Sequence, residues 1–368
     1  MKKRLKDVLD YEQPTKYIVD SQNYSEEFKT PVLTAGKSFI LGYIDETEGV
    51  YEASKNPVII FDDFTSASKY VDFDFKVKSS AMKILHLVNP KDSLRYVYYA
   101  MQKIDYVPFS HKRLWISDYC NFEIELPDSA MQNRVVADLD TTQKAIDLKR
   151  KQLEDLDELV KSKFQEMFGN PVENDKRWEM RVWKELFDTI LGKMLDVKKQ
   201  NSDDEIRLYL GNTNVQWRSF DLNGLKTMTF SNKEIDKLSL KKGDILICEG
   251  GESGRCAVWE EENSNILFQK AIHRARIKDP NVIEPHFIPF LMEFLRENNG
   301  LKNYVTQATI EHLTGEKLNK LSIIVPPIEQ QKVFAEFARK ADAANAIIKQ
   351  EISDLEEMMD SKMDEYFG

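Results

Sequence analysis

Cysteine is scarce in this chain, which has three cysteines in 368 residues. Cys120, Cys248 and Cys256 do not stand at the spacing of metal ligands, so the sequence excludes a disulfide framework and fits a reducing compartment. No apolar run approaches the roughly 20 residues of a membrane span. The opening residues also lack the apolar core of a signal peptide. We therefore expect a cytoplasmic protein without a membrane segment.

Catalytic motifs are missing as well. The segment Ala35-Gly-Lys-Ser38 resembles the end of a phosphate-binding loop, but Pro31 stands where that motif needs its first glycine. Neither Asn56-Pro57 nor Asn170-Pro171 continues into the Pro-Pro-aromatic motif of an amino-methyltransferase. The five histidines are scattered and form no HExxH or Cys/His cluster. We expect a binding protein with no catalytic residue, no metal site and no cofactor of its own.

The net charge of −10 does not exclude a nucleic-acid partner. Residues 1–126 have a net charge of −2 and residues 170–325 a net charge of −1, whereas 127–169 and 326–368 together carry −7. Most of the excess acid therefore belongs to two short segments. A nearly neutral domain can still present a basic face, because phosphate affinity depends on local Lys and Arg.

Those two acidic segments are copies of each other. Residues 127–169 align without a gap on 326–368 at a constant offset of 199, with identities such as Gln132/Gln331 and Leu156/Leu355. Repeats of this kind indicate the architecture of the whole chain. The order is therefore variable segment, helix, variable segment, helix, and the predicted parts are 1–126, 127–170, 171–325 and 326–368.

Each copy has the 3.5-residue spacing of a coiled-coil seam. For two tandem units related by a pseudo-two-fold axis, the two helices would pair antiparallel. A plainer alternative is that each amphipathic helix packs on its own domain. The apolar seam residues, which we also predict to matter for partner docking, are Leu139, Ile146, Leu153, Leu156, Val160, Ile348, Ile352, Leu355 and Met359.

The variable segments mix strand and helix patterns. An apolar run at 56–61 predicts a buried strand, and 240–250 predicts a turn followed by a core strand. Residues 94–104 and 288–296 have helical spacing, and 116–126 has strand-like alternation. Neither segment shows the regular alternation of a doubly wound fold. We predict α+β or α/β domains with twisted mixed sheets.

Several motifs in this order resemble the specificity (S) subunit of type I restriction–modification systems, and the resemblance covers essentially the whole chain. At the first helix start, Leu126-Pro-Asp-Ser-Ala-Met-Gln132 departs from the Pro-Pro…Glu-Gln form of the second copy. The motifs are Pro31-Val-Leu-Thr-Ala35, Ile40-Leu-Gly-Tyr43, Lys161-Ser-Lys-Phe-Gln-Glu-Met-Phe-Gly-Asn170, Gly243-Asp-Ile-Leu246, Glu249-Gly-Gly251, Gly254-Arg255, Phe268-Gln-Lys-Ala-Ile-His-Arg274, His312-Leu-Thr-Gly-Glu-Lys-Leu318, Ile324-Val-Pro-Pro-Ile-Glu-Gln-Gln331 and Ser361-Lys-Met-Asp-Glu-Tyr-Phe-Gly368.

The resemblance implies that each variable segment is a target recognition domain that reads one half of a bipartite site in double-stranded DNA. The helices would separate the domains and dock two methyltransferase (M) subunits. Those subunits would bind S-adenosylmethionine, and restriction (R) subunits would join for cleavage.

Residues that contact DNA should lie in loops near strand ends, where polar side chains can reach base edges and phosphates. Our candidates are Thr34, Lys37, Ser38, Thr65, Ser66, Lys69, His111, Lys112, Arg113, Asn212, Asn214, Gln216, Arg218, Ser253, Arg255, Gln269, Lys270, His273 and Arg274. Two other functions stay open at this point: a subunit with its own transferase or nuclease activity, and a coiled-coil scaffold with protein-binding heads.

Overall fold

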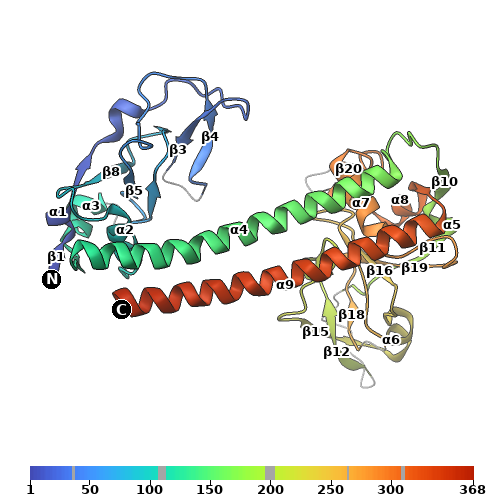
Figure 1. Cartoon of the computed structure of the whole chain (residues 1–368). Coiled ribbons are helices and arrows are strands. Elements are labelled where there is room, and N and C mark those ends of the chain that lie inside the picture. Colours follow the sequence, from blue (N-terminus) through green and yellow to red (C-terminus); the bar gives the residue numbers. More distant parts are fainter. Residues whose placement is uncertain (35–37, 107–112, 195–203, 263–264, 308–310) are drawn as a thin grey trace. The chain divides into compact units, whose positions relative to one another are not determined.

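The computed structural model describes residues 1–34, 38–106, 113–194, 204–262, 265–307 and 311–368 (Figure 1). It divides into two compact units, one of Met1–Lys151 with Lys349–Gly368 and one of Gln152–Ile348. The long helices α4 (Ser129–Phe168) and α9 (Ile328–Phe367) each contribute to both units. Within the described ranges, no helix is long and apolar enough to cross a membrane.

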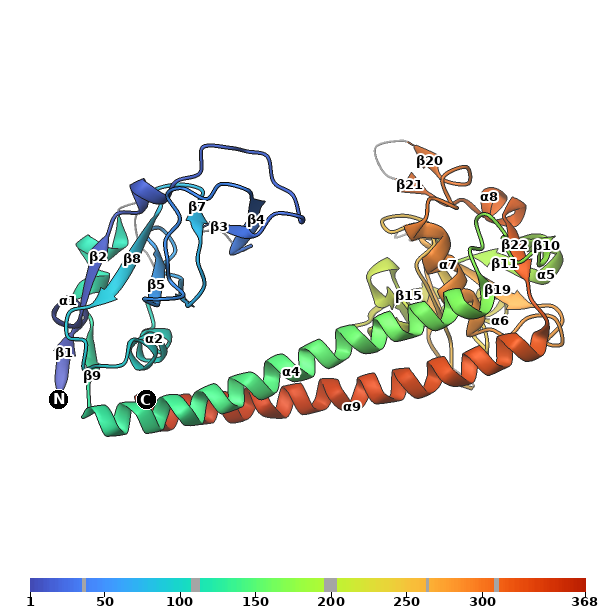
Figure 2. The ribbon, with the colours of Figure 1, turned by 45° about the horizontal axis from the view of Figure 1, so that its top comes forward.

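The first unit is built on two small sheets. A four-stranded antiparallel sheet has the order β2 (Leu9–Glu12), β8 (Met82–Leu87), β5 (Val58–Asp62) and β6 (Ser68–Val71). Figure 2 labels its strands β2, β8 and β5. A mixed sheet has the order β4 (Ile40–Ile44), β3 (Thr30–Leu33) and β7 (Lys76–Val77), with β3 and β7 parallel. The remaining elements are β1 (Lys2–Arg4) paired with β9 (Glu123–Glu125), and helices α1 (Leu5–Val8), α2 (Leu94–Gln102) and α3 (Leu114–Ser117).

The second unit repeats both sheets and the terminal strand pair, and adds two short strand pairs. Its antiparallel sheet has the order β11 (Phe187–Leu191), β19 (Ile272–Ile277), β16 (Ile245–Cys248) and β17 (Cys256–Val258). Its mixed sheet has the order β15 (Lys226–Phe230), β12 (Glu205–Leu210) and β18 (Leu267–Phe268), with β12 and β18 parallel. The other elements are β10 (Glu179–Val182) with β22 (Ser322–Val325), β13 (Val215–Gln216) with β14 (Ser219–Phe220), β20 (Thr306–Gln307) with β21 (Glu311–His312), and helices α5 (Trp183–Leu186), α6 (Asn232–Leu238), α7 (Phe287–Glu297) and α8 (Gly315–Lys320).

The mixed-sheet prediction and the two long helices are confirmed, and the predicted strands near 56–61 and 240–250 are β5 and β16. One local prediction is wrong. The strand expected over 116–126 is limited to β9, because the residues before it form α3 and a short 3-10 turn, Tyr119–Asn121. Trp115 and Tyr119 are buried there against Phe61, so packing of aromatic rings overrides the alternating pattern. The four-part division of the chain stays a prediction.

The long helices lie antiparallel within the first unit. Lys362 Nζ lies 2.6 Å from the Asp138 carboxylate, and the Tyr366 hydroxyl donates to the same carboxylate at 2.8 Å. Eleven residues further along α4, Lys149 lies 2.7 Å from Glu351. Since α9 runs backwards as α4 advances, the pairing is antiparallel, as the seam predicted.

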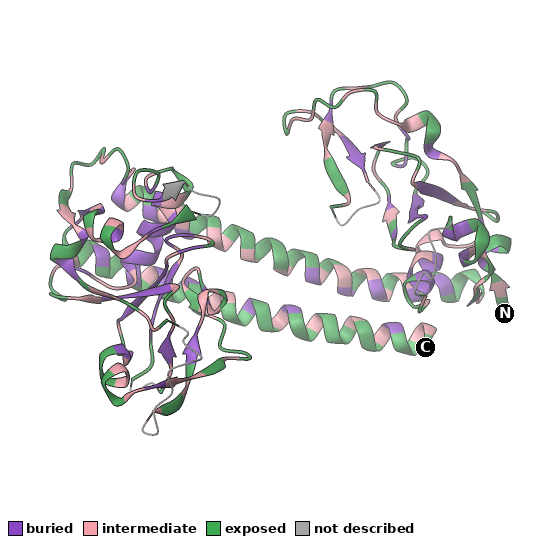
Figure 3. Cartoon of the chain, turned by 180° about the vertical axis from the view of Figure 1, so that it is seen from behind, coloured by how far each residue is buried: buried purple, intermediate pink, exposed green. Residues whose placement is uncertain are grey.

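The predicted seam is enclosed along both helices. Leu139, Ile146, Val160, Ile348 and Ile352 are buried, and the remaining apolar seam positions are half-buried. Figure 3 shows buried and intermediate residues alternating with exposed ones along each helix. The seam therefore holds the chain's own helices together.

The repeated glutamine fixes each long helix to its domain in the same way. Gln132 is fully buried, donates to Pro127 O at 2.9 Å and accepts from Ser93 N at 2.7 Å. Gln331 is also fully buried, donates to Pro326 O at 2.7 Å and accepts from Glu284 N at 3.0 Å. A buried amide must have its hydrogen bonds satisfied, which explains an identical residue at this point of both copies.

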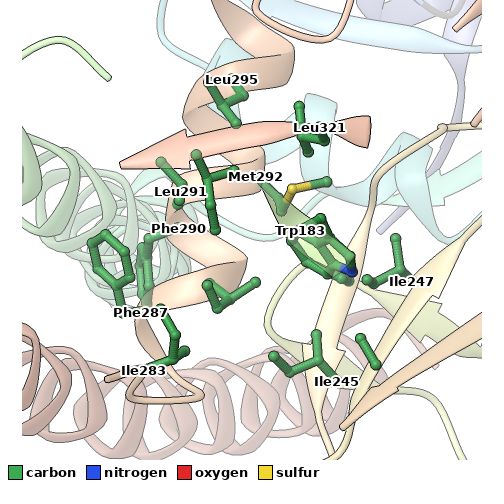
Figure 4. Packing of buried hydrophobic residues seen from close by; sticks show 14 of the residues in the cluster. Trp183, Ile245, Ile247, Ile283, Phe287, Phe290, Leu291, Met292, Leu295 and Leu321 are labelled. Atoms are coloured by element: carbon green, nitrogen blue, oxygen red, sulfur yellow. The ribbon is translucent and has the colours of Figure 1, made fainter. Parts of the chain in front are cut away.

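The C-terminal ends of the two long helices also make equivalent contacts, because each packs against a shorter helix of a variable domain. Phe168 at the end of α4 packs against Phe287 of α7, with ring centroids 4.8 Å apart. Its counterpart Phe367 at the end of α9 packs against Tyr96 of α2 at 5.2 Å. The core around Trp183 and Phe287 appears in Figure 4. Each unit therefore combines one domain, the start of one long helix and the end of the other.

Candidate nucleic-acid interface

The central strand of each four-stranded sheet ends in a turn that leads to the edge strand. We call residues 63–67, between β5 and β6, and residues 249–255, between β16 and β17, the strand-end turns. In both sheets the strand register places a residue of the adjacent strand, β8 or β19, opposite the penultimate residue of β5 or β16. Phe61 pairs with Lys83 in one, and Ile247 pairs with His273 in the other.

A buried ion pair fixes the first strand-end turn. Lys83 Nζ lies 3.1 Å from the Asp63 carboxylate, and both side chains are almost wholly buried. Asp63 also accepts from the backbone N–H of Trp115 at 2.9 Å, and its carbonyl accepts from Leu114 N at 3.0 Å. The pair therefore ties the turn to the segment that enters α3.

The second strand-end turn has the equivalent arrangement. His273 Nε2 lies 3.4 Å from the Glu249 carboxylate and 3.1 Å from Leu313 O. The Glu249 carbonyl accepts from Leu313 N at 2.7 Å. Leu313 and Leu114 differ by 199, so the same backbone contact recurs at the repeat offset. We call Lys83–Asp63 and His273–Glu249 the clasps. Burial lowers the pKa of His273, although the Glu249 carboxylate partly offsets this effect.

In the first unit, the described candidates gather around the clasp or lie at the end of β3. Thr65 and Ser66 are in the strand-end turn, Lys69 is exposed on β6, and Arg113 is exposed just before the anchored Leu114. The other two described candidates, half-buried Thr34 and exposed Ser38, follow β3, which belongs to the mixed sheet of this unit. Lys37, His111 and Lys112 lie outside the described residues.

In the second unit, three candidate residues are buried, and each makes hydrogen bonds within its own domain. Ser253 Oγ donates to Glu311 O at 2.8 Å, and His273 belongs to the clasp. Arg274 donates to the carbonyls of Lys237 and Ser239 at 3.1 and 3.2 Å. Because all three side chains are buried and make these contacts within the domain, they support its structure and do not face solvent.

Two half-buried residues shape the second strand-end turn. Arg255 donates to Asn212 O at 2.9 Å and pairs with Glu252 at 3.1 Å. Asn212 Nδ2 in turn donates to Gly250 O at 2.9 Å. These contacts connect the turn to the loop after β12.

The remaining candidates of the second unit differ in accessibility. Asn214 Oδ1 accepts from Gly211 N at 2.8 Å, so this side chain is used in its own turn. Gln269 is half-buried, whereas Gln216 and Lys270 are exposed. Gln216 Nε2 also donates to Thr213 O at 2.7 Å, whereas Lys270 is exposed in the loop after β18.

Arg218 serves a different purpose. It has a positive φ of 63°, lies 2.6 Å from Asp157 of α4 and stacks on Phe290 at 4.8 Å. Glu293 lies 3.7 Å from it, and burial raises the pKa of Glu293 while Arg218 and Lys161 oppose that shift. This network fixes the second domain to the end of α4.

One hollow of the second unit has several acidic side chains in its lining. A cavity of about 430 Å³ is lined by Trp217, Glu252, Glu293 and Glu311 among others. Four carboxylates, counting Glu297, disfavour a phosphate ligand. Among the residues that the structure describes, no group of three or more His, Cys, Asp or Glu could hold a metal ion.

Sequence reasoning missed three residues at the first turn. Lys83 and Asp63 form the clasp, and Phe64 is 48 % exposed at the tip of the turn. An apolar residue between Asp63 and Thr65, in an otherwise polar turn, was the available signal for Phe64. The clasp had no such signal, because its partners are 20 residues apart.

Comparison with known proteins identifies the family. Residues 175–357 match the type I restriction modification DNA specificity domain. The specificity subunit of the type I restriction enzyme EcoR124I/EcoR124II of Escherichia coli is 49% identical over 146 residues, which cover 37% of this chain and 36% of that protein. The EcoKI specificity subunit of Escherichia coli strain K12 is 23% identical over 235 residues, covering 60% and 50%. The matched regions thus span half or less of these curated relatives.

Two solved structures share the fold over the whole chain. The type I restriction–modification S subunit from M. genitalium has a TM-score of 0.60 at 15% identity, covering 100% of this chain and 96% of that one. A chain from a study of complex assembly and conformational transition of the type I R-M system has a TM-score of 0.57 at 15% identity, with coverage of 100% and 97%. From the matched domain, the curated relatives and the repeated fold together, the chain belongs to the family of type I restriction–modification DNA specificity subunits.

Proposed function

We propose that this chain gives a type I restriction–modification complex its DNA sequence specificity. Each domain would read one half of a bipartite site in double-stranded DNA. The observation that carries the proposal is the repetition of one strand order and one clasp in two domains of unrelated loop sequence. A shared scaffold with different loops suits two half-sites of different sequence, because base contacts come from loops.

The contacts that we propose follow from exposure. Lys69, Arg113 and Lys270 are exposed cations suited to phosphates, and Thr65 and Gln216 are exposed groups suited to base edges. Ser66 lies beside Thr65, Thr34 and Ser38 follow β3, and the loops after β12 and β18 hold Asn212, Asn214 and Gln269. For Lys37, His111 and Lys112 the proposal rests on sequence alone. Ser253, Arg255, His273, Arg274 and Arg218 would act by shaping these loops.

We infer that the long helices dock two methyltransferase subunits through their exposed sides. Leu148 and Met358 are 71% and 48% exposed in the first unit, and Ile347 and Leu159 are 63% and 53% exposed in the second. The offset of 199 turns Leu148 into Ile347 and Leu159 into Met358. Each unit therefore carries the same pair of exposed apolar positions. Two equivalent patches suit two copies of one partner.

In this proposal the chemistry belongs to the partners. The methyltransferase subunits would bind S-adenosylmethionine and methylate the DNA, and restriction subunits would join them for cleavage in the cytoplasm. This chain would contribute binding and position only. The seam residues would affect docking indirectly, since they are enclosed between the chain's own helices.

The deciding experiment compares modified bases across the genome of the source strain with and without this gene. Loss of methylation at one split motif, two short half-sites with a fixed gap, is the expected result. The same experiment on DNA exposed to the purified complex removes effects of expression. If the assembled complex binds all DNA sequences equally and methylates none, the chain is a protein-interaction scaffold and the proposal fails.

A further inference from the structure

We propose that Phe64 contacts the bases of the first half-site by stacking on a base or entering a base step. This inference rests on the proposed function and adds an apolar specificity contact to its polar ones. Apolar side chains that enter a base step unstack it, so they report the sequence-dependent ease of deformation. Three independent observations place Phe64 for this task.

The first observation is that several hydrogen bonds hold the turn around Phe64. Asp62 is 5% exposed, and its carboxylate accepts from Phe64 N at 2.9 Å and from Thr65 Oγ1 at 2.5 Å. The carbonyl of Asp62 accepts from Ser66 N at 3.0 Å. Ser66 adopts a left-handed φ of 61°, which lets the chain reverse within this short turn. A side chain on such a turn loses little further conformational freedom when it binds.

The second observation is the exposure of the ring itself. Phe64 is 48% exposed, whereas Phe61, three residues earlier and within β5, is fully buried. The core of the first unit takes up Phe61 with Trp115 and Tyr119 and leaves Phe64 outside. Exposing a large aromatic costs free energy that binding would recover.

The third observation concerns charge and the clasp. Phe64 directly follows Asp63, whose carbonyl bonds to Leu114 N, so the backbone of exposed Arg113 is held next to that of Phe64. Exposed Lys69 lies on the next strand. An exposed aromatic ring with exposed cations on neighbouring segments fits a nucleic acid, because the cations bind phosphates while the ring meets bases.

The second unit lacks a counterpart. Its strand-end turn presents Gly251 at its exposed part, with a φ of 74°, and Glu252 is bonded to Trp217 and Arg255. The inference therefore predicts an asymmetric result. Stacking would occur in the half-site that the first unit reads and not in the other.

The test uses the complete complex of this chain with its methyltransferase subunits and the DNA site found by methylation mapping. Binding would be measured for the full site, for a site altered in the first half and for a site altered in the second half. The variants are Phe64→Ala and Phe64→Trp. Val88→Ala is the matched control, because Val88 is 56% exposed just beyond β8, at the opposite end of the same sheet. Thermal unfolding would verify that each variant folds.

We expect Phe64→Ala to reduce discrimination of the first half-site roughly tenfold while discrimination of the second half and assembly stay unchanged. Phe64→Trp should retain it, and its added tryptophan fluorescence should be quenched by the full site but not by DNA altered in the first half. Unchanged discrimination in Phe64→Ala, or loss of assembly instead, would overturn the inference alone. A wild-type complex with no site selectivity would overturn the proposed function as well.

Discussion

Lys83 and His273 occupy the same position in the two four-stranded sheets. Each lies on the strand adjacent to β5 or β16, opposite the penultimate residue of that strand. Each also pairs with the acidic residue that begins the strand-end turn. The two residues share neither sequence context nor offset, since they are 190 apart while the helices repeat at 199. Position in the sheet, not residue type, therefore defines the clasp.

The buried ion pair should be costly to break from one side. Replacing Lys83 with Met leaves the Asp63 carboxylate buried without a cation, and such a change costs about 3–5 kcal/mol. Adding Asp63→Asn removes the charge and keeps an acceptor for Trp115 N, so the double variant should recover most of that loss. Hydrogen exchange of β5 and β8 would measure it. Equal protection in the wild type and in Lys83→Met would show that the pair is dispensable.

The corresponding clasp in the second unit should respond to pH. Burial lowers the pKa of His273 below its ordinary value of 6.5, so below that pH the unfolded chain binds a proton that the folded chain does not. The wild type therefore loses stability as pH falls through 6.5 towards the folded pKa. His273→Gln should cost less stability at pH 5.5 than at pH 7.5. Urea unfolding followed by tryptophan fluorescence, which comes mostly from the second unit, would check this.

His286 should show the opposite sign in the same unit. Burial lowers the pKa of His286, but hydrogen bonds to Glu284 and Glu260 outweigh burial and raise it overall. Its stabilising contribution is complete below pH 6.5 and is lost as pH rises through the folded pKa. His286→Gln should therefore cost more stability at pH 5.5 than at pH 7.5. The same unfolding assay applies, and a cost that does not change with pH would contradict the assignment.

Much of the fold could be predicted from the sequence because some equivalent side chains of the two long helices make the same contacts and are therefore identical in both copies. Gln132 and Gln331 make matching hydrogen bonds, so they are identical and the repeat is visible. The two variable domains share a backbone fold but not a sequence, and differences in loop length place Asp63 and Glu249 at an offset of 186 in place of 199. A repeated backbone can use a lysine in one copy and a histidine in the other. That equivalence appears only when strand register is known.

The candidate site could be predicted only in part, for a related reason. Loops near strand ends are recognisable by polar residues; Thr65 and Lys270 were predicted in this way, and both are exposed. Residue type does not reveal whether a polar side chain faces solvent or bonds inside its own domain, as Ser253 and Arg274 do. Phe64 was missed because an apolar residue is ordinarily assigned to the core.

Substitutions of Arg255 and Lys270 should distinguish a residue that shapes a DNA-binding loop from one that contacts DNA directly. Arg255→Ala removes two charge-assisted contacts from the second strand-end turn, worth about 1.5–3 kcal/mol each, so discrimination of the second half-site should fall while assembly persists. Lys270→Ala should weaken binding to every sequence and lower the salt dependence by about one phosphate contact. Salt titrations of both variants on matched and altered sites would distinguish them. Identical effects of the two changes would contradict this division.

The docking patches should fail one at a time. Leu148→Asp with Met358→Asp places two charges on the exposed apolar positions of the first unit, and Ile347→Asp with Leu159→Asp does the same in the second. Truncating a central interface contact costs about 2 kcal/mol or more, so each double variant should bind one methyltransferase subunit in place of two. Light scattering of the purified complexes would count the subunits.

The matched control exchanges the same side chains without adding charge. Leu148→Met with Met358→Leu keeps the apolar volume and should retain both subunits. Because the four positions are exposed, none of these changes should unfold the chain, whereas a charge in the enclosed seam would. If both charged double variants still bind two subunits, docking uses another face of the helices. If either one loses both subunits, the two patches are not independent, and the pseudo-two-fold account of docking is wrong.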